Sequence, residues 1–151
     1  MDLIKENKQR KRAIYKIDDT YKKVWNFKDI EWLDNHVNIL NEYVPGYVKQ
    51  HGWNNDTMWI IFDEIKGIPA SKFDHSPTFI SKIYNFCLKN IELTKPYAHG
   101  DWVLSNIIIN GDNMYMIDWD NINLYPEKDI FKKLHNDLRS AFGDKFDPSS
   151  L

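Results

Sequence analysis

The fold is decided by two short segments: His99-Gly100-Asp101-Trp102-Val103-Leu104-Ser105-Asn106 and, further on, Ile117-Asp118-Trp119-Asp120. Asp101 and Asn106 are five residues apart, and Asp118 follows Asn106 by twelve residues. Residues 106–118 alternate like a β-hairpin, with the turn at 111–113. Because a hairpin returns Asp118 toward the start of the strand that Asn106 opens, we expect the three polar side chains to lie close together.

These residue types suit phosphoryl transfer. That reaction needs a carboxylate to orient the attacking hydroxyl and accept its proton, and oxygen ligands to hold Mg²⁺ against nucleotide phosphates. A loop followed by a hairpin can bring one base and two ligands into one small space. A structural interpretation stays open, because Asp and Asn are also common turn and cap residues.

The His99-Gly100-Asp101 segment with Asn106, followed by Ile117-Asp118-Trp119-Asp120, resembles the signature of the aminoglycoside phosphotransferase and choline kinase family. The resemblance implies a protein-kinase-like fold and transfer of the γ-phosphate of ATP to a hydroxyl of a small molecule. It makes Asp101 the catalytic base, and Asn106 and Asp118 the Mg²⁺ ligands. His99 is then a structural residue of the catalytic loop, and the role of Asp120 is left open.

The N-terminal half fits a small antiparallel sheet with one helix. Strand-like segments are expected at 12–18, 20–25, 47–50 and 57–65, with a tight turn at Asp18-Asp19. Apolar residues at helical spacing predict a helix over 29–43, capped by Asp29. We therefore expect an α+β, minimal two-lobe protein-kinase-like fold, with an N-lobe at residues 1–65 and a C-lobe at 66–151.

The C-terminal half predicts a mostly helical lobe around the catalytic hairpin. Residues 66–69 are expected to form a linker, and Ser76-Pro77 to start a helix. One helix face is expected to pack in the core: Ile80, Ile83, Tyr84, Cys87, Leu88 and Ile91. A last helix over 127–142 has a similar face, formed by Ile130, Phe131, Leu134, Leu138 and Ala141, and ends at Gly143. The position of Cys87 on such a face predicts a structural thiol.

The resemblance also implies nucleotide-binding residues in the N-lobe. Lys23 is the chosen contact for the α- and β-phosphates, and Lys22, on the opposite face of its strand, is the alternative. The helix that follows offers Asp34 or Glu31 as the carboxylate that pairs with this lysine. Asp63 and Ile65 lie where the family's hinge meets adenine, mainly through backbone groups.

The chain departs from the family in three ways. No glycine precedes Gly46, so a glycine-rich loop over the phosphates is missing. The chain is short, and little follows Asp120 except one helix. We expect weak nucleotide affinity unless the basic run from Lys8 to Arg12 substitutes for the loop; otherwise we interpret this run, with Lys5, as a solvated end. The acceptor then binds either on an open surface or in a pocket that a second subunit completes in a homodimer.

Composition limits the other functions. The 151 residues are 42% hydrophobic and 15% aromatic with a net charge of −2, which favours an ordered domain without strong attraction to nucleic acid or membrane. One cysteine excludes an intrachain disulfide, and no stretch of about 18 apolar residues is present. We expect a cytoplasmic protein.

Two other functions compete with a small-molecule kinase. A non-catalytic, kinase-like nucleotide-binding module would explain the missing glycine loop. A metal-dependent hydrolase could use Asp101, Asp118 and Asp120 to bind two metals, but it leaves the N-terminal half unexplained.

Overall fold

A computed structural model describes residues 2–9 and 11–151, and the chain divides into two compact units, Met1–Glu64 and Ile65–Leu151. The elements are mixed α and β, as expected, with strands dominating the first unit and two long helices the second. The boundary predicted from the sequence, between residues 65 and 66, lies one residue further along the chain.

The first unit is built on an antiparallel sheet with the strand order β1-β2-β3-β5-β4. Its five strands are β1 (Asp2–Asn7), β2 (Arg12–Ile17), β3 (Thr20–Trp25), β4 (Val48–Trp53) and β5 (Met58–Asp63). The predicted strands are confirmed for β2, β3 and β5, and β4 continues beyond the predicted residue 50. Asp18 takes a left-handed φ of 51° in the predicted turn between β2 and β3.

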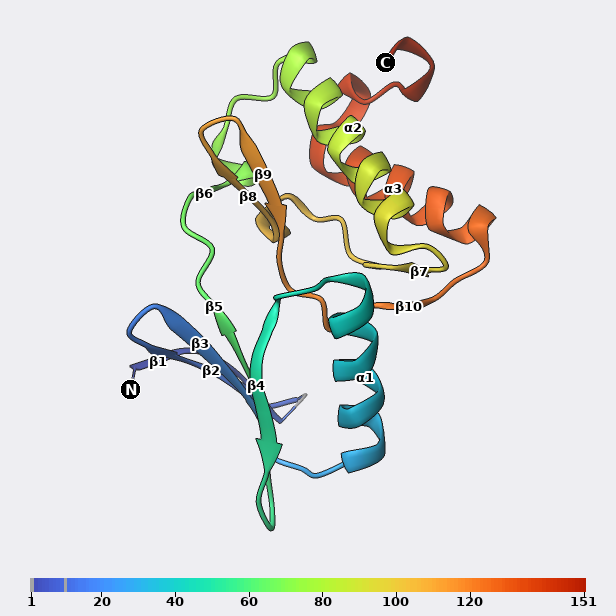
Figure 1. The fold of residues 1–151 in the computed structure, drawn as a ribbon. Coiled ribbons are helices and arrows are strands. Elements are labelled where there is room, and N and C mark those ends of the chain that lie inside the picture. Colours follow the sequence, from blue (N-terminus) through green and yellow to red (C-terminus); the bar gives the residue numbers. More distant parts are fainter. Residues whose placement is uncertain (1, 10) are drawn as a thin grey trace. The chain divides into compact units, whose positions relative to one another are not determined.

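Helix α1 (Ile30–Tyr43) covers one face of this sheet. Its start is capped as predicted, because the Asp29 side chain accepts a hydrogen bond from the Trp32 backbone N–H at 3.1 Å. The buried contact joins Leu33 and Val37 of the helix to sheet residues Trp25, Met58 and Ile60. Figure 1 shows α1 alongside β4. Apolar burial, worth about 1.5–3 kcal/mol for each large side chain, thus holds helix and sheet together.

The basic side chains Lys5, Lys8 and Lys11 are exposed, as expected for a solvated segment, but the backbone that leads into this run belongs to the sheet. Residues Asp2–Asn7 form strand β1, which pairs with β2 so that Lys5 faces Ile14 and Glu6 faces Ala13. The following turn places Lys11 at a φ of 52°, whereas Arg10 lies outside the described residues. The side chains of β1 are almost all exposed, so backbone hydrogen bonds and not apolar burial define it. Because these side chains show no apolar pattern, the sequence did not indicate a strand at residues 2–7.

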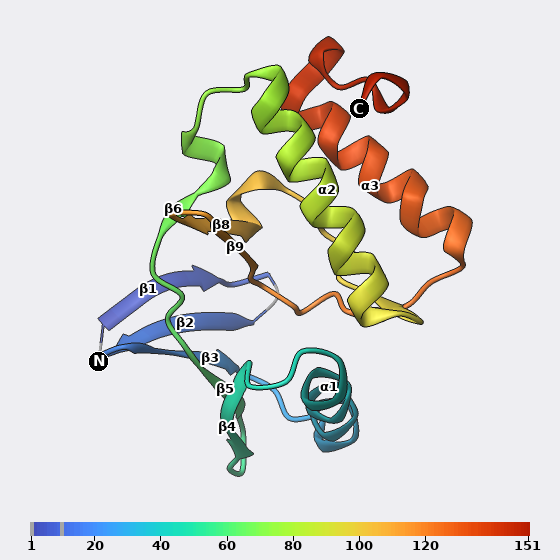
Figure 2. The same ribbon diagram turned by 45° about the horizontal axis from the view of Figure 1, so that its top comes forward.

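Two helices dominate the second unit: α2 (Pro77–Thr94) and α3 (Glu127–Phe142). Figures 1 and 2 show them side by side. The Ser76 hydroxyl accepts a hydrogen bond from the Phe79 backbone N–H at 3.2 Å and caps α2, and Gly143 ends α3 with a φ of 62°. The predicted core faces are confirmed except at Tyr84, Leu88, Phe131 and Ala141, which are only partly buried. Phe142 completes the buried face of α3.

Short strands complete the second unit. The predicted hairpin is β8 (Ile107–Asn110) with β9 (Asn113–Met116), and β6 (Ile68–Pro69) adds a third strand in the order β6-β8-β9. The linker expected at 66–69 is therefore wrong for residues 68 and 69, where Ile68 pairs with Ile109. A further pair joins β7 (Tyr97–Ala98) to β10 (Asn123–Leu124). Four 3₁₀ segments complete the described elements: η1 (Ala70–Lys72), η2 (Leu104–Asn106), η3 (Gly143–Lys145) and η4 (Pro148–Ser150).

Cys87 has the structural role that its position in the sequence predicts. The residue is fully buried on the inner face of α2. Burial raises the pKa of its thiol to about 12, so the reactive thiolate is not formed near neutral pH.

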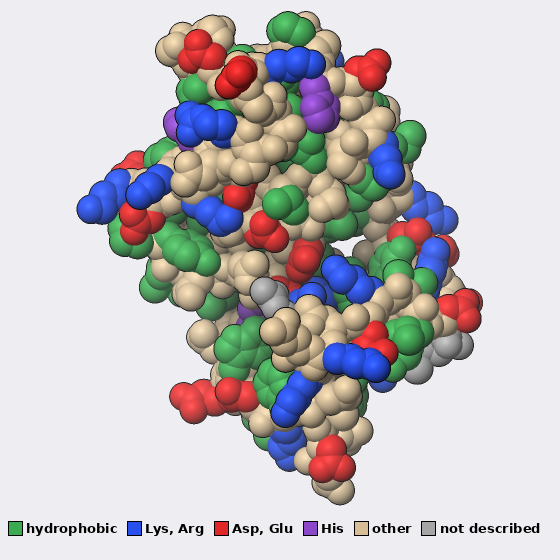
Figure 3. All heavy atoms as spheres, turned by 180° about the vertical axis from the view of Figure 1, so that it is seen from behind, with side chains coloured by type: hydrophobic (Ala, Val, Ile, Leu, Met, Phe, Trp, Pro, Cys, Tyr) green, Lys and Arg blue, Asp and Glu red, His purple; other side chains and the backbone are tan. Residues whose placement is uncertain are grey.

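The surface carries charges of both signs. Acidic and basic side chains are interspersed over the face drawn in Figure 3, in keeping with the net charge of −2. Within residues 2–9 and 11–151, none of the helices combines the length and the apolar character that crossing a bilayer requires.

Truncation of the α1 core should destabilise the first unit. Leu33 is fully buried, so Leu33→Ala should lower the free energy of unfolding by about 2–5 kcal/mol, because it removes apolar contacts and leaves a cavity. Asn35→Ala, on the exposed side of the same helix, should change it by about 0.5 kcal/mol or less. Urea unfolding followed by circular dichroism measures both values, and equal effects would contradict the described packing.

Candidate active site

His99 connects the predicted catalytic loop to the strand that precedes Asp118. Its Nε2 atom lies 2.8 Å from the Ile117 carbonyl oxygen, and its Nδ1 atom accepts a hydrogen bond from the Asp101 backbone N–H at 3.1 Å. Nε2 must therefore carry the proton that is donated to Ile117. The ring is fully buried, and burial is the main cause that lowers the pKa of His99. A neutral imidazole with both nitrogens bonded fits the structural role predicted for it.

Gly100 lets the loop turn beside His99. Its φ of 85° lies in the left-handed region, and a side chain here would come within 2.8 Å of the Tyr125 hydroxyl. That hydroxyl donates a hydrogen bond to the Asn121 carbonyl at 2.8 Å, so it cannot easily move away. The left-handed backbone at this position of the His-Gly-Asp segment therefore favours glycine, and the close Tyr125 hydroxyl adds to that preference.

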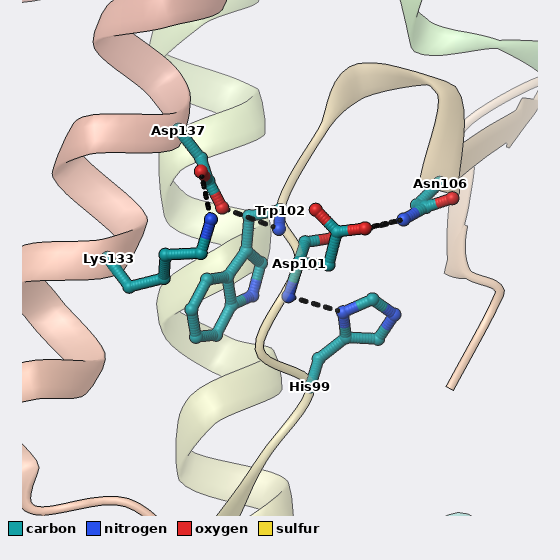
Figure 4. Close-up of polar contacts among 6 residues, drawn as sticks. All are labelled: His99, Asp101, Trp102, Asn106, Lys133 and Asp137. Atoms are coloured by element: carbon teal, nitrogen blue, oxygen red, sulfur yellow. Dashed lines mark hydrogen bonds and ion pairs between the residues drawn. The ribbon is translucent and has the colours of Figure 1, made fainter. Parts of the chain in front are cut away.

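Asp101 and Asn106 are in direct contact, in keeping with the expectation that they lie close together. The Asn106 side-chain Nδ2 donates to Oδ2 of Asp101 at 3.3 Å and to the Asp101 backbone oxygen at 3.1 Å. Figure 4 shows this amide nitrogen directed at Asp101, with the amide oxygen on the opposite side. Asn106 is buried and Asp101 is partly exposed. The amide thus fixes the carboxylate and keeps its own oxygen for another partner.

Asp118 lies next to this pair along the backbone. The Ile117 N–H donates to the Asn106 carbonyl at 2.8 Å, which places Asp118 one residue beyond the contact. Asp118 adopts a φ of 59°, in a region that Asp tolerates better than most residues but that still costs about 1–3 kcal/mol. Such a conformation persists only where the surrounding structure imposes it, and it marks Asp118 as a functional candidate.

Asp137 was missed in the sequence. This residue of α3 accepts a hydrogen bond from the Trp102 backbone N–H at 3.0 Å through Oδ2, and its Oδ1 pairs with Lys133 at 2.7 Å (Figure 4). The Asp137 side chain is only 11% exposed. Its position between Leu134 and Leu138, on the apolar side of the helix, could have indicated a structural role. A carboxylate on a buried helix face needs a hydrogen-bond or ion-pair partner.

The predicted nucleotide-binding residues of the first unit have different environments. Lys23 is buried, 3% exposed, and its Nζ lies 5.6 Å from the centre of the Phe62 ring. Lys22 faces the other side of the sheet, with Nζ 4.7 Å from the Trp59 ring. Asp34 and Glu31 are both exposed on α1, so the structure gives no preference for either as the partner of Lys23.

The predicted adenine contacts lie at the end of β5. Asp63 is exposed and forms an ion pair with Lys49 at 3.1 Å, and Ile65 is partly buried. The intervening Glu64 donates its backbone N–H to the Asp19 carbonyl at 2.8 Å. The adenine contact of Asp63 and Ile65 stays a prediction.

A cluster of acids for two metals is not found. Across the described part of the chain, no group of three or more His, Cys, Asp or Glu side chains is arranged to hold a metal ion. This gives no support to the hydrolase hypothesis, which needs Asp101, Asp118 and Asp120 together. A kinase site needs fewer protein ligands, because nucleotide phosphates supply the remaining oxygens.

Solved structures with the same architecture come from WbdD. A crystal structure of WbdD at 2.2 Å resolution aligns with this chain with a TM-score of 0.65 and 16% sequence identity. The alignment covers 90% of this chain and 36% of the WbdD chain. A structure described as the bifunctional kinase-methyltransferase WbdD gives a TM-score of 0.60 at 15% identity, over 87% and 35% of the two chains. The structure of WbdD with the kinase inhibitor LY294002 gives a TM-score of 0.63 at 17% identity, over 91% of this chain and 36% of the WbdD chain. The chain thus shares its fold with a segment of WbdD.

At this identity the similarity shows the fold alone, and the chain spans about a third of the WbdD chains it matches. The sequence matches no family model and no curated protein. The comparisons therefore show a fold shared with WbdD, whereas the aminoglycoside phosphotransferase and choline kinase family stays a resemblance.

Acid should weaken the fold through His99. The unfolded chain takes up a proton near pH 6.5, whereas the folded chain, with the lowered pKa of His99, takes it up only at a lower pH. The free energy of unfolding should therefore be greatest above about pH 6.5 and fall below it by up to roughly 1.4 kcal/mol per pH unit. Urea unfolding between about pH 5.5 and 7.5 measures this slope.

A matched pair of variants assigns the slope to His99. His99→Gln should reduce it, leaving the part due to His135, whose pKa is also lowered by burial. His51→Gln, at an exposed position in β4, should keep the wild-type slope. An unchanged slope in His99→Gln would contradict the assignment.

Asp137 should stabilise the second unit mainly through the loop backbone. Asp137→Ala leaves the buried Trp102 N–H without an acceptor and should lower the free energy of unfolding by about 1–3 kcal/mol. Lys133→Ala removes only the ion pair and should cost about 1 kcal/mol or less, because Lys133 is half exposed. Equal losses in chemical denaturation would assign the effect to the ion pair instead.

Proposed function

We propose that this chain is the catalytic core of an ATP- and Mg²⁺-dependent phosphotransferase that moves the γ-phosphate to a hydroxyl of a small molecule. The observation that carries the proposal is the connection between the catalytic loop and the β8–β9 hairpin. Asn106 contacts Asp101 directly, and the bonds of Asn106 and His99 to Ile117 bring in the residue before Asp118. Hydrogen bonds thus join the proposed base, one proposed ligand and the residue that precedes the other proposed ligand. The fold shared with WbdD, described as a bifunctional kinase-methyltransferase, supports the same proposal.

Asp101 is the proposed base. Its carboxylate is partly exposed, so an acceptor can reach it, and the 3.3 Å contact from Asn106 fixes one of its oxygens. The other oxygen points away from Asn106 in Figure 4. This free oxygen can orient an incoming hydroxyl and accept its proton as the new bond to phosphorus forms.

Asn106 and Asp118 are the proposed metal ligands, and their chemistry suits Mg²⁺. The amide oxygen of Asn106 faces away from Asp101, and Asp118 adds a carboxylate held by a left-handed backbone. Both are hard oxygen donors, which this ion prefers. When bound, the ion neutralises phosphate charge and helps to align the transferred group.

The first unit would supply the nucleotide contacts. Lys23 keeps its proposed role at the α- and β-phosphates, with Lys22 as the alternative. Asp34 remains the proposed partner of that lysine, and Asp63 and Ile65 the proposed adenine contacts. The acceptor, its binding in a homodimer and a cytoplasmic location are proposals of the same kind.

A non-catalytic nucleotide-binding module is the second candidate. The observation in its favour is the turn between β1 and β2, where the kinases have their glycine-rich loop and this chain has no glycine. Charged side chains at Lys8 and Lys11 stand there instead. The two candidates differ in one measurable property, which is turnover.

Substitution of the base and of the metal ligand should have different effects. Asp101→Asn should lower Mg²⁺-dependent ATP turnover by about 10²–10⁴-fold, because it removes the proton acceptor, while the thermal shift caused by Mg²⁺ and ATP persists. Asp118→Asn should lose both turnover and that thermal shift. Asp112→Asn, the same charge change at the exposed tip of the hairpin, should keep both.

Three results would count against a kinase. Wild-type turnover in Asp101→Asn would exclude the proposed base, and turnover without Mg²⁺ would exclude the metal site. A nucleotide-induced thermal shift with no turnover, in the presence of a broad panel of sugars, amino alcohols and nucleosides, would favour the binding module.

A further inference from the structure

A groove on the second unit lies outside the proposed site. It has a volume of about 620 Å³, in the range of ligand-binding clefts, and it runs between α2 and the turn of the β8–β9 hairpin. None of His99, Asp101, Asn106 or Asp118 lines it. Its function is therefore separate from the proposed chemistry, and the inference below does not rest on phosphoryl transfer.

The floor of the groove is apolar and aromatic. Phe73 and Phe79 stack with their ring centres 5.6 Å apart and their planes 11° apart, and both line the groove. Phe86 and Met114 line it as well, and all four side chains are partly exposed. Such a floor favours an apolar group on the ligand, because its binding would remove these rings from water.

The helix wall of the groove is basic. Lys82 and Lys89 both line it from α2, and both are exposed. Seven residues apart, they share one face of the helix, about 10.5 Å from each other along its axis. Neither forms an ion pair with any residue that the structure describes. Two lysines without ion-pair partners along one wall favour a ligand that carries two anionic groups at a similar spacing.

The opposite wall sets the orientation of a ligand. It consists of the hairpin turn with Gly111, Asp112 and Asn113. The Asp112 carboxylate would repel an acid placed against the turn, so the anionic groups of a ligand must face α2. Asn85, between the two lysines in sequence, lines the helix wall and can hydrogen-bond a peptide backbone.

We propose that this groove binds an extended acidic peptide segment, with two carboxylates three residues apart on Lys82 and Lys89 and an apolar residue between them on the aromatic floor. The spacing selects this ligand. In a polyproline-type extended chain, residues three apart project on the same side about 9 Å from each other, which matches the two lysines. A small monoanion could engage only one of them.

Fluorescence anisotropy with a defined probe tests the proposal. The probe is a fluorescein-labelled, C-terminally amidated Gly-Glu-Phe-Pro-Glu-Gly peptide, titrated with the full chain. Saturable binding is expected, weakened about tenfold or more by the double variant Lys82→Gln/Lys89→Gln and also by high salt. The double variant Lys128→Gln/Lys132→Gln makes the same charge change on exposed positions of α3, outside the groove, and should keep the affinity within about twofold.

Further arms separate the contributions of charge and shape. The Gly-Gln-Phe-Pro-Gln-Gly peptide should bind at least about tenfold more weakly, because it lacks both carboxylates. Asn85→Trp fills the groove from an exposed helix position and should abolish binding, with thermal melting and circular dichroism as the check on folding.

Each opposite result would overturn the proposal. Equal affinity for the Glu and Gln peptides, or for the wild type and the groove double variant, would remove the charge argument. Absence of saturable binding by the Glu peptide would exclude the ligand class. Binding of phenylacetate at the groove without binding of the peptide would assign the site to a small monoanion instead.

Discussion

The proposed site depends on one buried imidazole. His99 accepts a hydrogen bond from the Asp101 backbone N–H at one nitrogen and donates one to the Ile117 carbonyl at the other. It thereby joins the loop to the residue that follows β9, eighteen residues further along the chain. The bond works only in the neutral state, because a second ring proton would face the Asp101 N–H. Burial, which lowers the pKa of His99, therefore preserves the connection as well as hiding the ring. Asn106 bonds the same two residues, Asp101 and Ile117.

The loop is fixed from three directions by different kinds of contact. His99 holds it to the hairpin, Asn106 holds the Asp101 carboxylate, and Asp137 of α3 holds the Trp102 backbone. Two of these contacts engage main-chain N–H groups, and one engages the side chain proposed to do chemistry. A carboxylate held in this way is oriented before an acceptor arrives, which lowers the entropic cost of reaching a reactive geometry.

The sequence predicted what periodic burial and local turns control. The cap at Asp29, the stripe through Ile83 and Cys87, and the β8–β9 hairpin all follow from spacing, and the structure confirms them. It did not predict β1, whose exposed side chains carry no apolar pattern, or the pairing of Ile68 with Ile109, which joins distant residues. In the site, the proximity of Asn106 and Asp101 was expected from the loop and hairpin, whereas their hydrogen bond was not. The contact of Asp137 could not be expected, because it forms with a backbone group thirty-five residues away.

The contact between Asp137 and the Trp102 N–H has a consequence for how such a loop can change over time. Because Asp137 binds the main chain, every residue except proline can present the same N–H at position 102. The exposed neighbours Val103 and Ser105 are not part of this attachment. Substitutions there can alter the loop surface while the geometry of Asp101 is retained, so a small fold of this kind can change what contacts the loop without rebuilding the proposed base.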